Sequence, residues 1–230
     1  MNNKTDKTKR IWELDFFRGA ALLAMVYFHL IYDLKEFYLY PVRYENGINF
    51  YIGRASALIF ILVSGISCTL CRHNVQRGWK VLGIGLLISV ATTLYSPDYA
   101  VKFGILHFLG ICMLLSALFS RLNAMMLVIL GTAAIWLGGV AFQTPVTVGF
   151  LFPLGFTDQS FFSSDYYPLF PWLGVFLYGV AVGKLLYSNK RSLLNFPLPD
   201  TLLNKIGRKT LPIYIVHQPI TLWLLSIFLR

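Results

Sequence analysis

The sequence predicts an all-α fold, a polytopic transmembrane helical bundle with about seven spans. The first supporting observation is composition: of the 230 residues, 57% are hydrophobic and 13% are charged, whereas a soluble domain carries about 25% charged residues. The second is length, because several apolar segments approach the roughly 20 residues that cross a bilayer as a helix. The third is charge placement, because Lys and Arg concentrate in alternate connections. Together these observations exclude an ordinary soluble protein.

Hydropathy places the predicted spans in order along the chain. They cover residues 16–38, 50–71, 81–95, 103–119, 124–142, 168–187 and 211–229. The third is short and contains Gly83 and Gly85. Residues 147–156 are also apolar, but this stretch is too short to span and has prolines and a glycine around it. We therefore expect an interfacial or re-entrant segment there.

The basic residues set the predicted orientation. Arg43 and Lys102 lie in the connections of one side, and most other loop cations lie on the opposite side. The positive-inside rule then predicts the N-terminus in the cytoplasm and the C-terminus outside. We expect one integral-membrane domain over residues 1–230, with a cytoplasmic tail at 1–12 and a cytoplasmic loop at 188–210. The main cytoplasmic cations are Lys4, Lys7, Lys9, Arg10, Arg72, Arg77, Lys80, Arg121, Lys184, Lys190, Arg191, Lys205, Arg208 and Lys209.

The net charge of +10 is accounted for by these loop cations. A nucleic-acid partner would need a basic face in water, so none is expected, and the lipid bilayer is the predicted surrounding. The three cysteines, Cys68, Cys71 and Cys112, are odd in number and lie in apolar stretches. A disulfide framework is therefore not expected, and without further thiols or paired histidines no metal site is predicted.

Polar residues in the first span form one stripe. Arg18 and His29 are separated by three helical turns, about 16 Å along the axis, and Asp15 and Asp33 fall on the same face by their spacing. A charge inside a span costs at least about 2.5–3.5 kcal/mol, so each one needs a reason. Arg18 near the cytosolic surface could bind phosphate, and His29 could remove a proton from an attacking hydroxyl or amine, with Asp33 orienting it.

A purely structural interpretation of the stripe also stays open. Asp15 and Arg18 could simply pair at the interface, while His29 forms a hydrogen bond to a neighbouring helix. Arg54 lies near the outer end of the second span and could pair with Asp33. His107, near the outer end of the fourth span, and His217 beside Gln218 in the seventh are further candidates, although intramembrane histidines often serve helix packing.

These residues and several short motifs resemble two families of membrane acyltransferases. The Arg18 and His29 spacing resembles the arginine and histidine of the acyltransferase 3 type. The chain as a whole is more similar to bacterial proteins related to the catalytic domain of heparan-α-glucosaminide N-acetyltransferase. The motifs are Leu14-Asp15-Phe16-Phe17-Arg18-Gly19, Leu62-Val63-Ser64-Gly65, Phe103-Gly104-Ile105-Leu106-His107, Phe170-Pro171-Trp172-Leu173-Gly174, and Gly207-Arg208-Lys209 followed by Ile213-Tyr214-Ile215-Val216-His217-Gln218-Pro219.

The resemblance implies that a cytosolic acyl-CoA, usually acetyl-CoA, donates an acyl group to a hydroxyl or amine of a sugar or glycan. It also implies a multi-pass protein of the bacterial cytoplasmic (inner) membrane, and it leaves a homo-oligomer open. The chain has fewer spans than the ten of acyltransferase 3 proteins. The connection at 39–49, where lysosomal relatives place their key histidine, contains none.

The expected site divides into three groups of residues. We expect catalysis from His29, Asp33 and His107, with His107 as the substitute base; donor binding from Arg18, Asp15, Arg72, Arg77 and Lys209; and acceptor binding from Arg54, His217 and Gln218. The alternatives are a small-molecule or proton-coupled transporter, for which His29, Asp33 and Arg54 would form the relay, and a non-catalytic membrane scaffold. The sequence shows no inverted repeats and no paired broken helices, which many transporter folds contain, and this counts against the transporter alternative.

Overall fold

The computed structural model describes residues 11–144, 146, 149–194 and 201–229. The chain divides into two compact units, which are considered separately. Unit 1 comprises Met1–Val63 with Asn189–Arg230, and unit 2 comprises Ser64–Ser188. The expectation of one functional domain over the whole chain stays a prediction.

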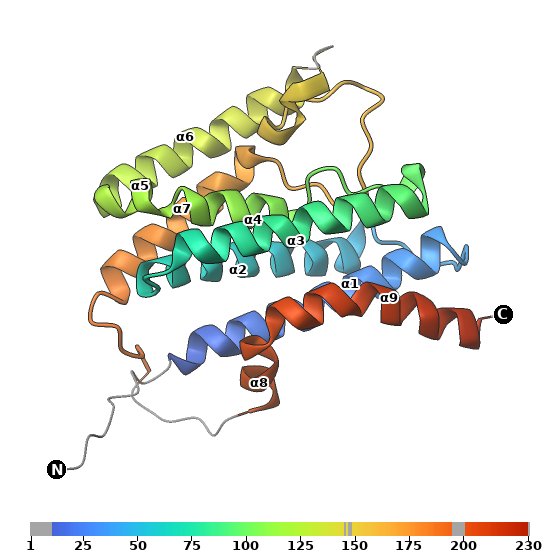
Figure 1. The fold of residues 1–230 in the computed structure, drawn as a ribbon, viewed down its shortest axis with the longest axis horizontal. Helices are drawn as coiled ribbons and strands as arrows, with labels where there is room; N and C mark the ends of the chain where they lie inside the picture. Colours follow the sequence, from blue (N-terminus) through green and yellow to red (C-terminus); the bar gives the residue numbers. More distant parts are fainter. Residues whose placement is uncertain (1–10, 145, 147–148, 195–200, 230) are drawn as a thin grey trace. The chain divides into compact units, whose positions relative to one another are not determined.

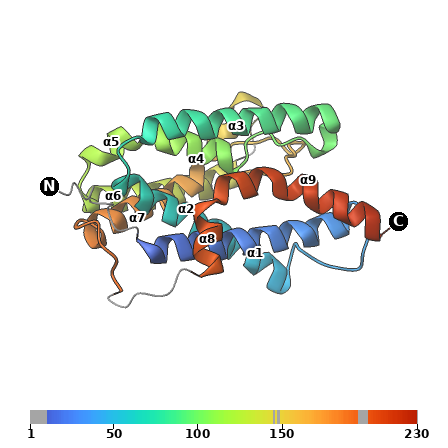
Figure 2. The ribbon, with the colours of Figure 1, turned by 60° about the horizontal axis from the view of Figure 1, so that its bottom comes forward.

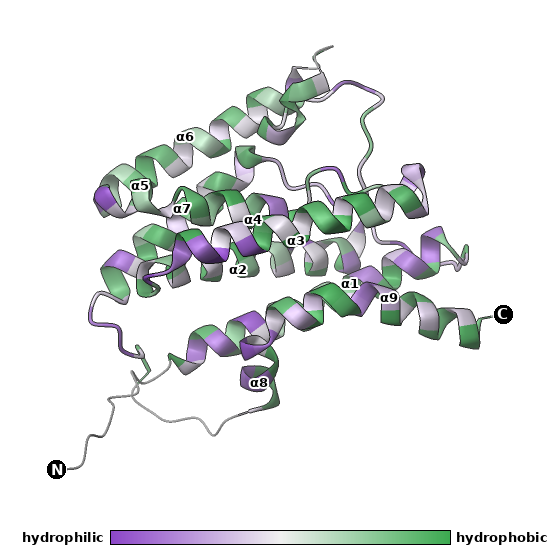
Figure 3. Cartoon of the chain, viewed as in Figure 1, coloured by the Kyte–Doolittle hydropathy of each residue, from purple (hydrophilic) through white to green (hydrophobic). Residues whose placement is uncertain are grey.

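In the described part of the chain, six helices are long and apolar enough to cross a membrane, which confirms the predicted all-α transmembrane class. Hydrophobic residues predominate along them (Figure 3). A shorter apolar helix, α4 (Ile105–Leu114), lies within the fourth predicted span, at 103–119. The six long helices are α1 (Trp12–Glu36), α2 (Gly47–Leu70), α3 (Asn74–Tyr95), α6 (Ala124–Gln143), α7 (Leu169–Leu186) and α9 (Thr210–Phe228).

The structure differs from the predicted spans at three places. The segment 103–119 is not one helix, because α4 ends at Leu114 with Leu115 as its C-cap, and a separate short helix, α5 (Ser116–Arg121), follows. Helix α3 begins at Asn74 rather than near Val81. The first turns of this helix are polar, so the span predicted from hydropathy did not include them. In the expected interfacial segment, residues 149–154 form the 3₁₀ helix η2 (Gly149–Leu154), and residues 147–148 lie outside the described part.

Unit 1 contains α1, the first part of α2, the short helix α8 (Leu202–Arg208) and α9. Helix α9 runs beside α1, and α8 is set across the N-terminal half of α1 (Figures 1 and 2). Glycines allow the crossing of α1 and α8. A Cβ on Gly19 would lie 2.1 Å from the Leu203 carbonyl oxygen, and a Cβ on Gly207 would lie 1.8 Å from that of Asp15. The two backbones are therefore in direct contact.

Unit 2 contains two closely packed helix pairs, α3 with α4 and α6 with α7. Small residues bring α6 and α7 together, since a Cβ on Gly174 would lie 2.4 Å from the carbonyl oxygen of Gly131. Such contacts are typical of helix packing in membranes. The 3₁₀ helix η1 (Pro97–Tyr99) follows α3, and the segment before α7 returns to the start of α4 through the Tyr167 N–H, which donates to the Phe103 carbonyl at 2.8 Å.

Candidate active site

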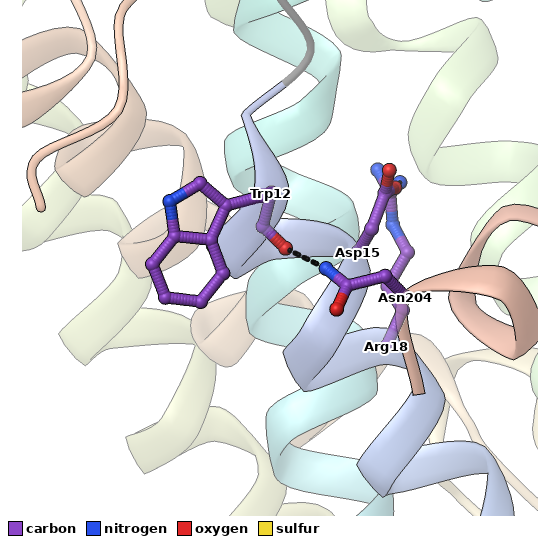
Figure 4. A network of polar contacts seen from close by, with 4 residues as sticks. All are labelled: Trp12, Asp15, Arg18 and Asn204. Atoms are coloured by element: carbon purple, nitrogen blue, oxygen red, sulfur yellow. Dashed lines mark hydrogen bonds and ion pairs between the residues drawn. The ribbon is translucent and has the colours of Figure 1, made fainter. Parts of the chain in front are cut away.

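The N-terminal end of α1 carries the first group of candidate residues. Arg18 Nη1 donates to Asp15 Oδ1 at 3.1 Å, so the ion pair of the structural interpretation is present (Figure 4). Asp15 is buried, whereas the Arg18 side chain retains 22% of its surface exposed. The guanidinium therefore has a fixed position and can still be reached by an anion.

Helix α8 holds this end of α1 through Asn204. The Asn204 side chain is buried, and its Nδ2 donates to the Trp12 carbonyl oxygen at 2.8 Å (Figure 4). Thr201, the N-cap of α8, accepts from the Asn204 backbone N–H. Lys209, an expected donor-binding residue, follows α8 directly and is exposed. Unit 1 thus contains Arg18, Asp15 and Lys209 at or beside the α1–α8 crossing.

Glu13 is a further buried carboxylate that the sequence analysis did not single out. Its Oε1 accepts from the Leu193 N–H at 2.8 Å and its Oε2 from the Ser192 hydroxyl at 2.7 Å. Because Glu13 and Asp15 lie in the first turn of α1, the helix dipole also favours their negative charge. Their place at a helix N-terminus was the available signal. Glu13 attaches the segment before α8 to the start of α1.

The second group lies where α1 and α9 run side by side, and it consists of two cross-helix pairs. The rings of His29 and His217 are in edge-to-face contact, with centroids 5.1 Å apart. One helical turn further along α1, Asp33 is fully buried, and its Oδ1 accepts from Gln218 Nε2 at 2.6 Å. The structure therefore brings together four of the predicted site residues.

Three acceptor atoms in this group have no hydrogen-bond partner. His217 Nδ1 must donate to the Tyr214 carbonyl oxygen at 2.6 Å, because a carbonyl oxygen only accepts. The neutral ring then presents a lone pair at Nε2, which is buried and without a partner, like Asp33 Oδ2 and Gln218 Oε1. Unpaired buried acceptors are rare in proteins. These three acceptor atoms are suited to bind a ligand that carries O–H or N–H donors.

Two expected contacts of Asp33 do not occur. Its carboxylate bonds to Gln218 and not to His29 or Arg54. Arg54 is exposed, and its guanidinium lies over the Phe50 ring, 5.2 Å from the centroid. The reason is the register of α9, which places an amide rather than a cation beside the carboxylate. Asp33 therefore holds α9 in place and does not orient His29 directly.

His107 lies in unit 2, and both of its ring nitrogens are engaged. Nδ1 accepts from the Gly104 N–H at 3.2 Å, and Nε2 lies 3.2 Å from Ser89 Oγ. Because the Ser89 hydroxyl itself donates to the Val101 carbonyl, the Nε2–H must donate to Ser89. Asp165, which the sequence analysis missed, caps the same helix end by accepting from the Ile105 N–H at 3.0 Å. This network positions the start of α4.

Arg72 and Arg77 also belong to unit 2, at the connection between α2 and α3, and both are exposed. Burial alone would raise the pKa of the nearby Cys71 thiol, but a hydrogen bond and the positive charge of Arg77 lower it, helped by the His73 backbone. Within the described ranges, no group of three His, Cys, Asp or Glu side chains is arranged to hold a metal ion.

A comparison with protein families adds an independent finding. The family described as heparan-alpha-glucosaminide N-acetyltransferase, catalytic, matches residues 10–219. No match was found among curated proteins or solved structures. The match extends from the start of α1 to Pro219 in α9 and so includes both groups of candidate residues. The chain, a multi-pass membrane protein, therefore belongs to this family of transmembrane acetyltransferase catalytic domains.

Proposed function

We propose that the protein transfers an acetyl group from cytosolic acetyl-CoA to a hydroxyl or amine of a sugar or glycan acceptor. The observation that carries the proposal is the contact of His29 with His217 inside two membrane helices of a chain from an acetyltransferase family. Intramembrane ionisable residues mark functional sites by default. We also propose the bacterial cytoplasmic membrane as the location, with the N-terminus in the cytosol.

The donor binds through the phosphates of CoA at the α1–α8 crossing. Arg18 is held by Asp15 and remains partly exposed, and a guanidinium can bind phosphate through two parallel hydrogen bonds. Lys209 adds positive charge in unit 1. Because these cations are exposed or partly exposed, salt should weaken the binding of CoA.

His29 is the proposed general base. It removes the proton from the acceptor while the acceptor oxygen or nitrogen attacks the thioester carbonyl carbon, and the carbon–sulfur bond to CoA breaks. His29 is half-buried, so a substrate can reach it, whereas both nitrogens of His107 are engaged. The distance of about 16 Å along the helix between Arg18 and His29 is comparable to the reach of the pantetheine arm of CoA.

The acceptor is proposed to bind near Arg54, His217 and Gln218. The unpaired acceptor atoms of His217 and Gln218 are suited to the hydroxyl and amine groups of a sugar. Asp33 acts as a positioning residue, because its bond to Gln218 fixes α9 against α1.

The test is acetyl transfer by the purified protein in proteoliposomes supplied with acetyl-CoA and a set of sugar acceptors. A positioned base contributes about 10²–10⁴-fold, so His29→Ala should reduce turnover by this factor and leave CoA affinity nearly unchanged. The matched control is His73→Ala, because His73 is exposed in the connection before α3. Near-normal turnover in His29→Ala would exclude His29 as the base.

A further inference from the structure

His217 has the geometry of a base whose tautomer is fixed. The residue is 9% exposed, and its Nδ1–H donates to the Tyr214 carbonyl oxygen at 2.6 Å. The partner at one ring nitrogen decides which nitrogen carries the proton. Nε2 is therefore a proton acceptor, and it is buried without a hydrogen-bond partner. A role in helix packing accounts for the bond at Nδ1, but it leaves the unpaired Nε2 unexplained.

The position of the His217 ring is set by two contacts between α1 and α9. The His29 and His217 rings have centroids 5.1 Å apart, within the separation of about 4.5–7 Å for rings in contact. The bond from Gln218 to Asp33 fixes the adjacent residue of α9. Helix α9 therefore cannot slide along α1, and carry His217 away from His29, without breaking a buried hydrogen bond.

We infer that His217 is a second imidazole of the proton-transfer machinery and accepts at Nε2 the proton that His29 removes from the acyl acceptor. This inference rests on the proposed function. When the acceptor oxygen or nitrogen attacks the thioester, its proton passes to His29 and then, once a small ring movement brings the two imidazoles within hydrogen-bond distance, to His217 Nε2. The carbon–sulfur bond breaks, the electron pair leaves with the CoA sulfur, and the proton finally returns to this sulfur. The products are the acetylated acceptor and CoA thiol.

The surroundings of His217 favour one shared proton on the two imidazoles. An isolated buried cation is costly, and two rings in contact distribute its charge. Asp33, whose Oδ2 has no hydrogen-bond partner, lies one helical turn from His29 on α1, and its ionised form would stabilise a positive imidazole. Among the described residues, the titratable groups that lie against His217 or against its neighbour Gln218 include His29 and Asp33 on α1 and Tyr214 on α9, whose ring centroid lies 5.4 Å from that of His217.

The test compares His217→Asn with wild-type protein in the acetyl-transfer assay. Asparagine retains a side-chain N–H that can donate to the Tyr214 carbonyl and lacks any equivalent of Nε2, so it separates proton transfer from packing. We expect kcat to fall at least about tenfold, with CoA affinity and thermal stability close to wild type. The pH profile of kcat should lose one ionisation. His73→Asn is the matched control and should leave kcat and its pH profile unchanged.

Two outcomes would overturn the inference. One is a wild-type kcat and pH profile in His217→Asn when His29→Ala is inactive, which would reduce His217 to packing and leave the proposed function standing. The other is a His217 tautomer protonated at Nε2, measured by ¹⁵N NMR of histidine-labelled protein in nanodiscs and assigned by the signal lost in His217→Asn. A wild-type protein without transfer activity would instead refute the proposed function, and this proton-transfer step with it.

Discussion

Replacing Gly207 by alanine should force α8 away from α1. The added Cβ would lie 1.8 Å from the Asp15 carbonyl oxygen and 2.7 Å from its carbonyl carbon. Cβ contacts under 3.0 Å are essentially absent from real structures, so the helices must separate by about 1.2 Å at this point. Both atoms belong to the backbone of α1, and no side-chain rotation can relieve the contact.

The expected change in the free energy of unfolding has two destabilising contributions and one stabilising contribution. Overpacking of this kind costs about 1–3 kcal/mol. The shift also stretches the 2.8 Å bond from Asn204 to the Trp12 carbonyl, and an unpaired buried polar group costs about 1–3 kcal/mol. Alanine regains about 1 kcal/mol of helix propensity over glycine. The net loss in the free energy of unfolding is therefore about 1–5 kcal/mol.

Thermal unfolding of the detergent-solubilised protein, followed by the loss of helical circular dichroism, measures this effect. The matched control is Gly83→Ala in α3, because a Cβ on Gly83 would have nothing within 4 Å. Gly83→Ala should unfold at or slightly above the wild-type temperature, and Gly207→Ala clearly below it. Equal unfolding temperatures for the two variants would refute the direct backbone contact between α1 and α8.

Two further predictions concern orientation and donor binding. A periplasmic reporter fused to the C-terminus should be active, because the alternation of loop cations places this end outside; a cytoplasmic C-terminus would reverse the topology and put Arg18 on the wrong side for cytosolic CoA. Arg18→Ala should weaken CoA binding in isothermal titration calorimetry, and the loss should shrink at high salt because the contact is partly exposed. Wild-type affinity in this variant would remove Arg18 from the donor site.

The membrane helices could be predicted from sequence because the bilayer imposes their length and composition. The prediction of one helix over 103–119 was wrong, and the segment after the break is held by a contact that is distant in sequence. The break at Leu115 starts α5, and the end of α5 is held by Lys184 of α7, which donates to the carbonyl oxygens of Ser120 and Leu122. Lys184 is more than 60 residues away in sequence, so a hydropathy profile does not contain this contact.

The stripe on the first span could also be predicted, because Asp15 and Arg18 are three residues apart on one helix and their ion pair is local. The partners of His29 and Asp33 could be named only as candidates. Which residue of α9 meets which residue of α1 depends on the register of two helices that are far apart in sequence. Glu13 and Asp165 were missed for the same reason, since each accepts a backbone N–H from a segment 180 or 60 residues away.

The amide partner of Asp33 has a consequence for the proposed chemistry. A cation such as Arg54 beside this buried carboxylate would neutralise it before the reaction starts. Gln218 is neutral, and it satisfies only Oδ1. Burial without a cation partner disfavours the ionised form of Asp33, and a positive charge on an imidazole of the His29–His217 pair would favour that form. Stabilisation of a charge that appears only during the reaction lowers the barrier without strengthening ground-state binding, so the neutral partner favours turnover.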